Sequence, residues 1–352
     1  MPRFLTGPVV VRPPATSANL GPGFDAFGLA LELRDEVTVE VFDGPVGIGP
    51  PAPDQVLEGL TVEVRGEGEG TLPLDERHLL VQAIRAAFAE LGGQPIGLRV
   101  RCHNRIPHGR GLGSSSAAIC AGLAAARALV EGGEKLLDDA QMLDLATRLE
   151  GHPDNVAPCL SGGLTIAWMT EPEVLAHGVS GIKNRGYDHD GPGAKEYGAL
   201  GQQARMLRLD PDPDVRPVVF IPDAALATAV SRGLLPEAVP HRDAAFNAGR
   251  AGLLVAALTQ PGLSHQHRCA LLYAGTRDRL HQDYRAPAMP ASAALIEHLS
   301  ALRFPAMVSG AGPTVLALAT GARQAEQVLG HAPADVTAMI ASVAGSGVLV
   351  ER

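Results

Sequence analysis

The segment Pro107–Ala118, PHGRGLGSSSAA, places three glycines at alternate positions directly before a run of serines and alanines. Alternating residues over 98–102 predict a strand before it, and the Ala-rich run 114–130 predicts a helix after it. Glycines let the backbone approach a ligand closely. Serines at a helix start cap it, and the free N–H groups there favour anions such as phosphate. The segment therefore indicates either a phosphate-binding loop or a simple glycine turn before a helix.

Two common phosphate-binding patterns do not describe this loop. A Walker A loop has Lys followed by Ser or Thr after its last glycine, whereas Ser114 and Ser115 follow Gly113 directly. A dinucleotide fingerprint spaces its glycines one and then two residues apart, and Ser114 stands where the third glycine belongs. The sequence therefore disfavours a nicotinamide dehydrogenase.

Outward from this loop, strand-like and helix-like patterns are mixed along a chain of 352 residues, which allows one large domain or two ordinary ones. Strands are predicted at 9–11, 36–41, 61–65, 164–168, 216–221, 307–309 and 314–319, and further helices at 78–91, 140–149, 244–258 and 292–302. This order predicts two α+β layers rather than a clean parallel α/β fold. The Gly-rich stretch 174–203 predicts a long loop or insertion, with the domain boundary inside 165–205.

Composition narrows the function classes. Apolar residues make up 46% and charged residues 19%, as in an ordinary globular chain. The net charge of −9 makes the chain a poor general binder of nucleic acid or membrane surfaces. The first residues have no long apolar run before Arg12, so we expect no signal peptide. The four cysteines have no paired spacing, which predicts reduced thiols in a cytoplasmic protein.

Two further segments concentrate polar residues. Pro14–Asp25, PATSANLGPGFD, holds Asn19 and Asp25 in a Gly/Pro-shaped loop that we predict to be neither helix nor strand. Such a loop can present a carboxylate to a cation, although Asn and Asp more commonly cap turns. Glu150–Pro158, EGHPDNVAP, packs four polar types into six residues, which suits a metal ligand, an orienting imidazole and a general base. A helix end with a solvated turn is the alternative.

Together with Ser309–Val315, SGAGPTV, these segments resemble the ordered motifs of the GHMP small-molecule kinases, from about Val10 to Ala319. The wording of 14–25 and 151–158 is most similar to the homoserine kinases of that superfamily. The resemblance implies a two-domain α+β fold: a domain like ribosomal protein S5 domain 2 over 1–170, a Gly-rich linker or insertion over 171–205, and a ferredoxin-like domain over 206–352. It also implies transfer of the ATP γ-phosphoryl group to the hydroxyl of L-homoserine, in threonine biosynthesis, by a homodimer that needs Mg²⁺.

The resemblance assigns the nucleotide and metal roles residue by residue. The ATP-binding residues would be Pro107, His108, Gly109, Arg110, Gly111, Leu112, Gly113, Ser114, Ser115, Ser116 and Ala117, with Gly310 and Gly312. Ser115 would help to hold Mg²⁺ with a helical acid, either Glu150 or Asp144. Glu150 is preferred, because its longer side chain lies nearer the 151–158 turn.

The same resemblance assigns the catalytic and amino-acid roles. Asp154, Asn155 and Arg232 would be catalytic, with Asp154 as candidate base; direct proton passage to the phosphate is the alternative, because Asn155 can occupy the equivalent spot. The substrate residues would be Asn19, Asp25, His152, Thr228, Arg232 and Arg285. Charge agrees with these roles, since Asp25 can pair an ammonium and an arginine fork suits a carboxylate.

The chain departs from the family at Ser116, where alanine is usual, and at 174–203, which has no family counterpart. Two rival hypotheses remain. A mevalonate or sugar kinase would lack the sequence motifs at 14–25 and 151–158. A catalytically silent ATP-binding regulator would have lost Asp154, Glu150 or Ser115, all of which are present.

Overall fold

The computed structural model describes residues 2–42, 59–170 and 202–352. Its strands are β1 (Val9–Arg12), β2 (Pro14–Ala18), β3 (Phe27–Arg34), β4 (Glu36–Phe42), β5 (Leu60–Gly66), β6 (Gly97–Asn104), β7 (Leu164–Met169), β8 (Ala204–Leu209), β9 (Val215–Pro222), β10 (Ala306–Val308), β11 (Val315–Thr320), β12 (Val336–Ile340) and β13 (Leu349–Glu351). Its α-helices are α1 (Leu79–Glu90), α2 (Ser114–Ala128), α3 (Gly133–Leu136), α4 (Asp139–Glu150), α5 (Pro153–Ser161), α6 (Thr228–Arg232), α7 (His241–Thr259), α8 (His265–Gly275), α9 (Gln282–Arg285), α10 (Pro290–Ala301) and α11 (Gly321–Leu329).

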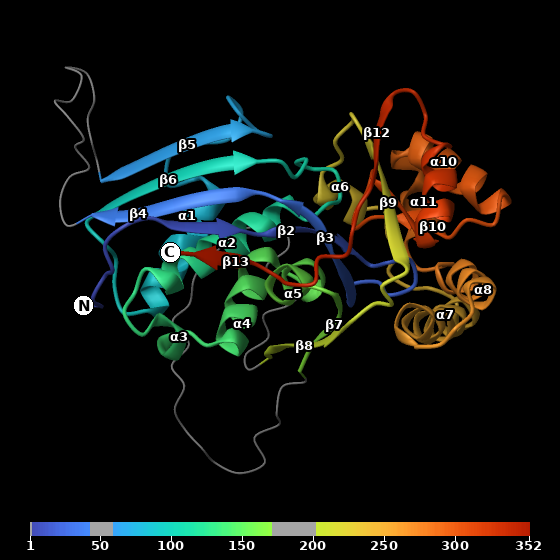
Figure 1. The fold of residues 1–352 in the computed structure, drawn as a ribbon, viewed down its shortest axis with the longest axis horizontal. Coiled ribbons are helices and arrows are strands. Elements are labelled where there is room, and N and C mark those ends of the chain that lie inside the picture. The colour runs from blue at the N-terminus through green and yellow to red at the C-terminus, as the bar shows by residue number, and fades with distance from the viewer. Residues whose placement is uncertain (1, 43–58, 171–201) are drawn as a thin grey trace, which may run out of the picture.

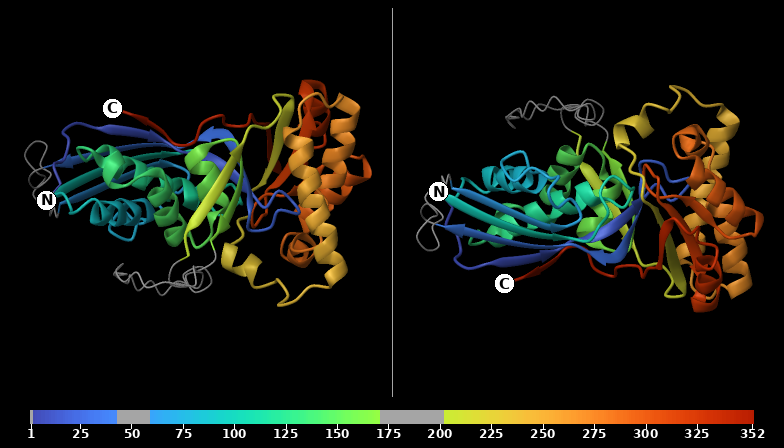
Figure 2. Two further views of the ribbon diagram at one scale, coloured as in Figure 1. Left: turned by 90° about the horizontal axis from the view of Figure 1, so that it is seen from below. Right: turned by 90° about the horizontal axis from the view of Figure 1, so that it is seen from above.

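The strands form three sheets in two structural units, which lie at opposite ends of an elongated molecule (Figures 1 and 2). The N-terminal unit holds the sheet β13-β1-β4-β6-β5, the sheet β2-β3-β7-β8 and helices α1 to α5. The C-terminal unit holds the sheet β10-β11-β9-β12 with α7, α8, α10 and α11. The predicted α+β fold class is confirmed, as are the helices and strands predicted at the ranges given above.

Two strands join the N-terminal unit from beyond residue 203. β8 pairs antiparallel with β7, and β13 pairs antiparallel with β1 at the other end of the chain. Residues 206–209 and 349–351 therefore lie in N-terminal sheets, although the sequence places them with the C-terminal domain. Pairing with β13 covers the edge of β1, which would otherwise expose unpaired backbone groups. The Gly-rich stretch 174–203 lies almost entirely outside the described residues.

The helix α2 runs through the centre of the N-terminal core. Ten of its residues are buried, and half of these are alanine. Its small side chains allow a close approach to α1, since a Cβ at Gly122 would lie 2.7 Å from the Leu80 carbonyl oxygen. This packing fixes the direction of α2 and so the position of its first turn.

The prediction that 14–25 forms neither helix nor strand is wrong for its first part. Pro14–Ala18 is the strand β2, and all five of its residues are buried. Only the following residues form a turn, in which Asn19, Leu20 and Asp25 adopt left-handed φ angles of 68°, 48° and 55°. Such angles in residues other than glycine are typical of functional sites. Across the residues that the structure describes, we find no helix with the length and apolar character to span a membrane.

Candidate active site

A cavity of about 200 Å³ lies where the two units meet. Its lining residues come from 19–25, 109–115, 150–155, 228–232, 285 and 310–311. Each segment that the sequence analysis selected for chemistry therefore contributes to one cavity. These segments are far apart in the sequence: Ser17 and Ser309, which form a hydrogen bond beside the cavity, are separated by 292 positions.

The glycine loop is shaped by close contacts on both sides. Gly109, Gly111 and Gly113 all adopt left-handed φ angles, of 66°, 78° and 68°. A Cβ at Gly111 would lie 2.2 Å from the Ser309 carbonyl oxygen, and one at Gly113 would lie 2.0 Å from Thr16 Oγ1. Side chains are therefore disfavoured at all three positions by conformation, and at Gly111 and Gly113 also by space. The loop is fixed between β2 and the Ser309 turn.

The first turn of α2 faces the cavity without a side-chain cap. Contrary to the sequence prediction, the serines do not cap the helix: its N-cap is Gly113, and Ser114 is already the first helical residue. Within the described chain, no side-chain hydrogen bond caps this end of the helix. Its N–H groups have no intrahelical partners. The cavity therefore has a helix N-terminus that favours an anion.

Ser115 and Glu150 form a pair of oxygen donors beside this helix end. The Ser115 hydroxyl donates to Glu150 Oε1 at 2.7 Å, and both residues line the cavity. Burial by the surrounding protein raises the pKa of Glu150, although the residue is still partly exposed to solvent. Asp144 does not line the cavity. Its carboxylate accepts from the Ala204 backbone N–H at 3.3 Å and pairs with Arg148 at 3.3 Å.

The start of α5 holds an ion pair at the other wall. The alternative of a helix end with a solvated turn does not describe the whole segment: α4 ends at Glu150, but Pro153 begins α5, and that helix continues past Pro158. Asp154 is 2% exposed, and its Oδ1 pairs with His152 Nδ1. Burial alone would raise the pKa of Asp154, but the charge and hydrogen bond of His152 lower it. Asn155 Oδ1 accepts from the Thr16 hydroxyl at 2.8 Å, which ties α5 to β2.

Burial alone would lower the pKa of His152, but Asp154 and Glu150 together raise it to about 9. An unfolded histidine titrates near 6.5. Between pH 6.5 and 9, His152 is therefore protonated in the folded chain but not in the unfolded chain. The stabilisation from this protonated histidine is complete below pH 6.5 and disappears as the pH rises through 9. We expect the free energy of unfolding to fall by up to roughly 3 kcal/mol over this range. Urea unfolding at several pH values checks this, and an unchanged pH slope in His152→Gln would contradict it.

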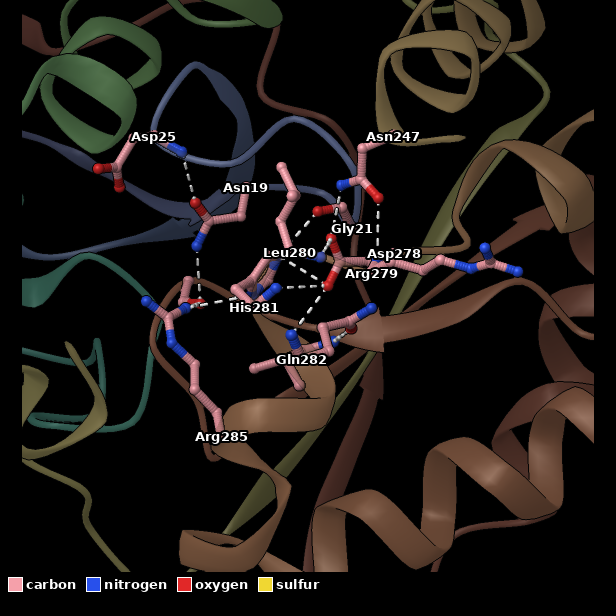
Figure 3. A network of polar contacts seen from close by, with 12 residues as sticks. Asn19, Gly21, Asp25, Asn247, Asp278, Arg279, Leu280, His281, Gln282 and Arg285 are labelled. Carbon is pink, nitrogen blue, oxygen red and sulfur yellow. Dashed lines mark hydrogen bonds and ion pairs between the residues drawn. The ribbon is translucent and has the colours of Figure 1, made fainter. Parts of the chain in front are cut away.

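Across the cavity from the start of α2 lie the charged side chains that were predicted to bind the amino-acid substrate. Asp25 pairs with Arg232 through Oδ1 at 3.0 Å and Oδ2 at 3.5 Å. Asn19 accepts from the Asp25 backbone N–H at 2.9 Å and donates to the Gly310 carbonyl oxygen at 2.8 Å (Figure 3). Thr228, at the start of α6, also lines the cavity.

Arg285 is the most buried charged group of this wall, with 2% of the residue exposed. Its guanidinium donates to the Gly310 carbonyl oxygen at 3.3 Å. Among the described residues, none accepts a hydrogen bond from its Nε, although that atom is buried. Burial lowers the pKa of Arg285, but an arginine stays protonated. A buried cation with a donor to spare is suited to an anionic ligand.

Several predicted nucleotide residues do not line this cavity. They are Pro107, His108, Arg110, Leu112, Ser116, Ala117 and Gly312. Leu112 and Ser116 are at most 1% exposed and pack inward, and Arg110 donates to the Asp223 carbonyl oxygen at 3.0 Å. His108 and Ala117 instead line a second cavity.

This second cavity, of about 240 Å³, shares Ser114 and Ser115 with the first. Most of its other walls are apolar side chains from separate segments, including Val37, Leu72, Leu79 and Ala118. Sequence reasoning missed it, because isolated apolar residues in helices and strands do not differ from core residues. Only their shared position beside the glycine loop distinguishes them.

Comparison with known proteins agrees with this geometry. The family model described as GHMP kinases N terminal domain matches residues 78–163, and that described as GHMP kinases C terminal matches residues 255–335. The homoserine kinase of Streptomyces coelicolor is 54% identical over 318 residues, covering 90% of this chain and 86% of the relative. That of Clavibacter michiganensis is 44% identical, covering 97% and 94%.

Solved structures show the same fold. The crystal structure of homoserine kinase from Cytophaga hutchinsonii has a TM-score of 0.72 at 22% identity and covers 99% of each chain. The L. major mevalonate kinase has a TM-score of 0.64 at 15% identity, covering 99% of this chain and 100% of that one. These two structural similarities support the fold, whereas the sequence relatives identify the family within the GHMP kinases. The chain belongs to the homoserine kinase family of the GHMP kinases.

Proposed function

We propose that this chain transfers the γ-phosphoryl group of ATP to the hydroxyl of L-homoserine, giving O-phospho-L-homoserine and ADP. One observation carries the proposal: a single cavity joins an uncapped helix N-terminus to a wall of buried charges suited to a zwitterion. Phosphoryl transfer depends on alignment and charge neutralisation, and this arrangement offers both.

ATP fits the two adjacent cavities, which share Ser114 and Ser115. Its adenosine would occupy the largely apolar second cavity, and its phosphates would lie across Ser114 and Ser115, which both cavities share. The N–H groups at the start of α2 would bind the phosphate oxygens. Gly310 and Ala311 close the cavity from the C-terminal unit.

L-Homoserine fits the opposite wall. Arg285 is a buried cation whose Nε–H has no acceptor in the described part of the chain, which suits the substrate carboxylate. Asp25 supplies the carboxylate for the substrate ammonium and is itself oriented by Asn19 and Arg232. Bound in this way, the amino acid extends its hydroxyl toward Ser115 and the glycine loop.

The residues around Ser115 fit Mg²⁺. The Ser115 hydroxyl and the Glu150 carboxylate are hard oxygen donors 2.7 Å apart at the phosphate end of the cavity. In the described residues we find no cluster of three or more His, Cys, Asp or Glu side chains that could hold a metal. This donor set suits Mg²⁺, which commonly takes one or two carboxylates and completes its shell with phosphates and water. When bound, the ion would neutralise phosphate charge.

The low pKa of Asp154 makes this carboxylate a weak proton acceptor. We therefore propose that the substrate proton passes directly to the transferred phosphoryl group. Asp154 would hold the His152 imidazolium in place, and Arg232 would balance negative charge in the cavity.

Replacing Asp154 with asparagine tests this assignment. Asparagine keeps the shape and can still accept from His152, so we expect kcat to fall by less than about tenfold, the size of a lost charge interaction of roughly 1.4 kcal/mol. Steady-state kinetics measure this. A loss of a thousandfold or more, with substrate KM values unchanged, would identify Asp154 as an obligatory base.

The substrate itself is tested by ADP release with L-homoserine, L-serine, L-threonine, mevalonate and galactose at equal concentrations. We expect kcat/KM for L-homoserine to exceed that for each of the others by at least about a hundredfold, since the others leave the charged wall unpaired or misplace the hydroxyl. Preference for mevalonate or galactose would favour another GHMP kinase, and ATP binding without ADP release on any of them would favour a silent regulator.

A further inference from the structure

A buried carboxylate organises the segment that precedes Arg285. The side chain of Asp278 is fully buried. It accepts from the backbone N–H groups of Leu280, His281 and Gln282 at 3.0, 3.0 and 2.8 Å, and from Asn247 Nδ2 at 2.7 Å (Figure 3). Burial alone would raise the pKa of Asp278, but these hydrogen bonds help to lower it. The turn that carries His281 is therefore rigidly held.

The partners of His281 define its proton position. Its Nδ1 lies 3.2 Å from NH1 of Arg285, which can only donate, so Nδ1 must accept. Its Nε2 lies 2.7 Å from the Gly21 carbonyl oxygen, which can only accept, so Nε2 must carry a hydrogen. Both contacts are satisfied only by the neutral imidazole protonated at Nε2. Burial lowers the pKa of His281, which is 0% exposed, and this agrees with the neutral form.

The first contact of His281 holds the Arg285 guanidinium. The same NH1 that donates to His281 also donates to the Gly310 carbonyl oxygen at 3.3 Å, and the guanidinium carbon lies 5.4 Å from the centre of the Phe24 ring. Phe24 in turn lies 5.3 Å from the His281 ring. NH1 is therefore held on two sides, while the buried Nε has no hydrogen-bond acceptor among the described residues.

The second contact of His281 holds the loop that carries Asp25. Gly21 has a φ of 77°, and a Cβ there would lie 2.4 Å from the Thr276 carbonyl oxygen. The loop is therefore pressed against the C-terminal unit at this residue. His281 thus touches both elements that would recognise the substrate, the Arg285 side chain and the loop ending in Asp25, from outside the cavity (Figure 3).

We propose that His281 is a positioning residue for amino-acid recognition, which fixes the Arg285 guanidinium through Nδ1 and the substrate loop through Nε2. The inference rests on the proposed role of Arg285 in binding the substrate carboxylate. His281 does not line the cavity, so it would not contact a substrate bound there. It acts through Arg285, so its loss affects recognition of the amino acid and not of ATP.

Two substitutions separate the contacts. Glutamine reaches the Nε2 position with a donor for Gly21 but leaves Arg285 without its acceptor. Asparagine places an oxygen near the Nδ1 position and loses the Gly21 contact. We expect His281→Gln to raise the KM for L-homoserine about tenfold, with kcat and the KM for ATP within about twofold of wild type. In His281→Asn, which keeps an acceptor for Arg285, we expect the KM for L-homoserine to rise by less than about threefold. His267→Gln, the same change at an exposed histidine, is the matched control.

A double-substitution cycle shows whether His281 acts through Arg285. We expect Arg285→Ala to raise the KM for L-homoserine strongly, and addition of His281→Gln to change that KM by less than about twofold. Thermal unfolding of each variant confirms that it is folded. Additive effects, or a His281→Gln enzyme with unchanged KM beside an impaired Arg285→Ala enzyme, would overturn the role of His281 alone. An unchanged KM in Arg285→Ala would instead overturn the carboxylate role of Arg285, and His281 with it.

Discussion

Replacing Arg285 with alanine is expected to raise the KM for L-homoserine by a factor on the order of 10² or more, while the KM for ATP stays within about twofold. The substrate carboxylate would lose its buried partner, and truncating one member of such a charge pair costs about 2–5 kcal/mol. Steady-state kinetics with each substrate varied in turn measure both constants. Equal increases in the two KM values would contradict the assignment, because they would indicate general damage to the fold.

A substrate without the carboxylate provides the control for this result. Wild-type enzyme should use 3-aminopropan-1-ol, which is homoserine lacking its carboxylate, far more weakly than L-homoserine. Arg285→Ala should lose little further activity toward that amine, because the missing interaction is the same one. Arg285→Lys keeps the charge but not the planar fork, so we expect a KM between those of wild type and the alanine variant.

Glu150→Gln is expected to lower kcat/KM for ATP in magnesium by a factor on the order of 10²–10³. Removal of a carboxylate from the metal site would sacrifice several kcal/mol of charge stabilisation. The apparent affinity for Mg²⁺ in the presence of a non-hydrolysable ATP analogue should fall in parallel, as titration calorimetry can measure. The KM for L-homoserine should change little, because the charged wall lies across the cavity.

Asp144→Asn is the matched variant on the same helix. Asp144 bonds to the Ala204 backbone and to Arg148 instead of lining the cavity, so its replacement should leave magnesium dependence within about twofold of wild type. The reverse pattern, with a strong magnesium effect at Asp144 and none at Glu150, would reject the pairing of Ser115 with Glu150.

Much of the fold follows from local patterns in the sequence. The strand β6 and the helix α2 are visible as alternation and as an Ala-rich run, because each has neighbours of contrasting polarity. β2 was missed because all five of its residues are buried and no alternation remains. α5 was missed because Pro158 lies inside it, where proline normally ends a helix.

The site was predictable only as far as its motifs. The glycine loop and the Asp25 and His152 segments have characteristic wording, and the structure brings them to one cavity. The second cavity has no such wording, because apolar residues from separate elements form it. His281 was not identified as a functional residue, because the residue type and its place in the sequence do not indicate a role. Its importance comes from contacts with Gly21, 260 positions away, and with Arg285.

The central claim is that nucleotide phosphates bind at the start of α2 while an amino acid binds opposite. A crystal structure with a non-hydrolysable ATP analogue, Mg²⁺ and L-homoserine tests it most directly. We expect phosphate oxygens within hydrogen-bonding distance of the backbone N–H groups over Gly111–Ser115, and the homoserine carboxylate on Arg285 with its hydroxyl directed at the γ-phosphate. Triphosphate bound elsewhere, with the first turn of α2 lacking an anion, would contradict the claim.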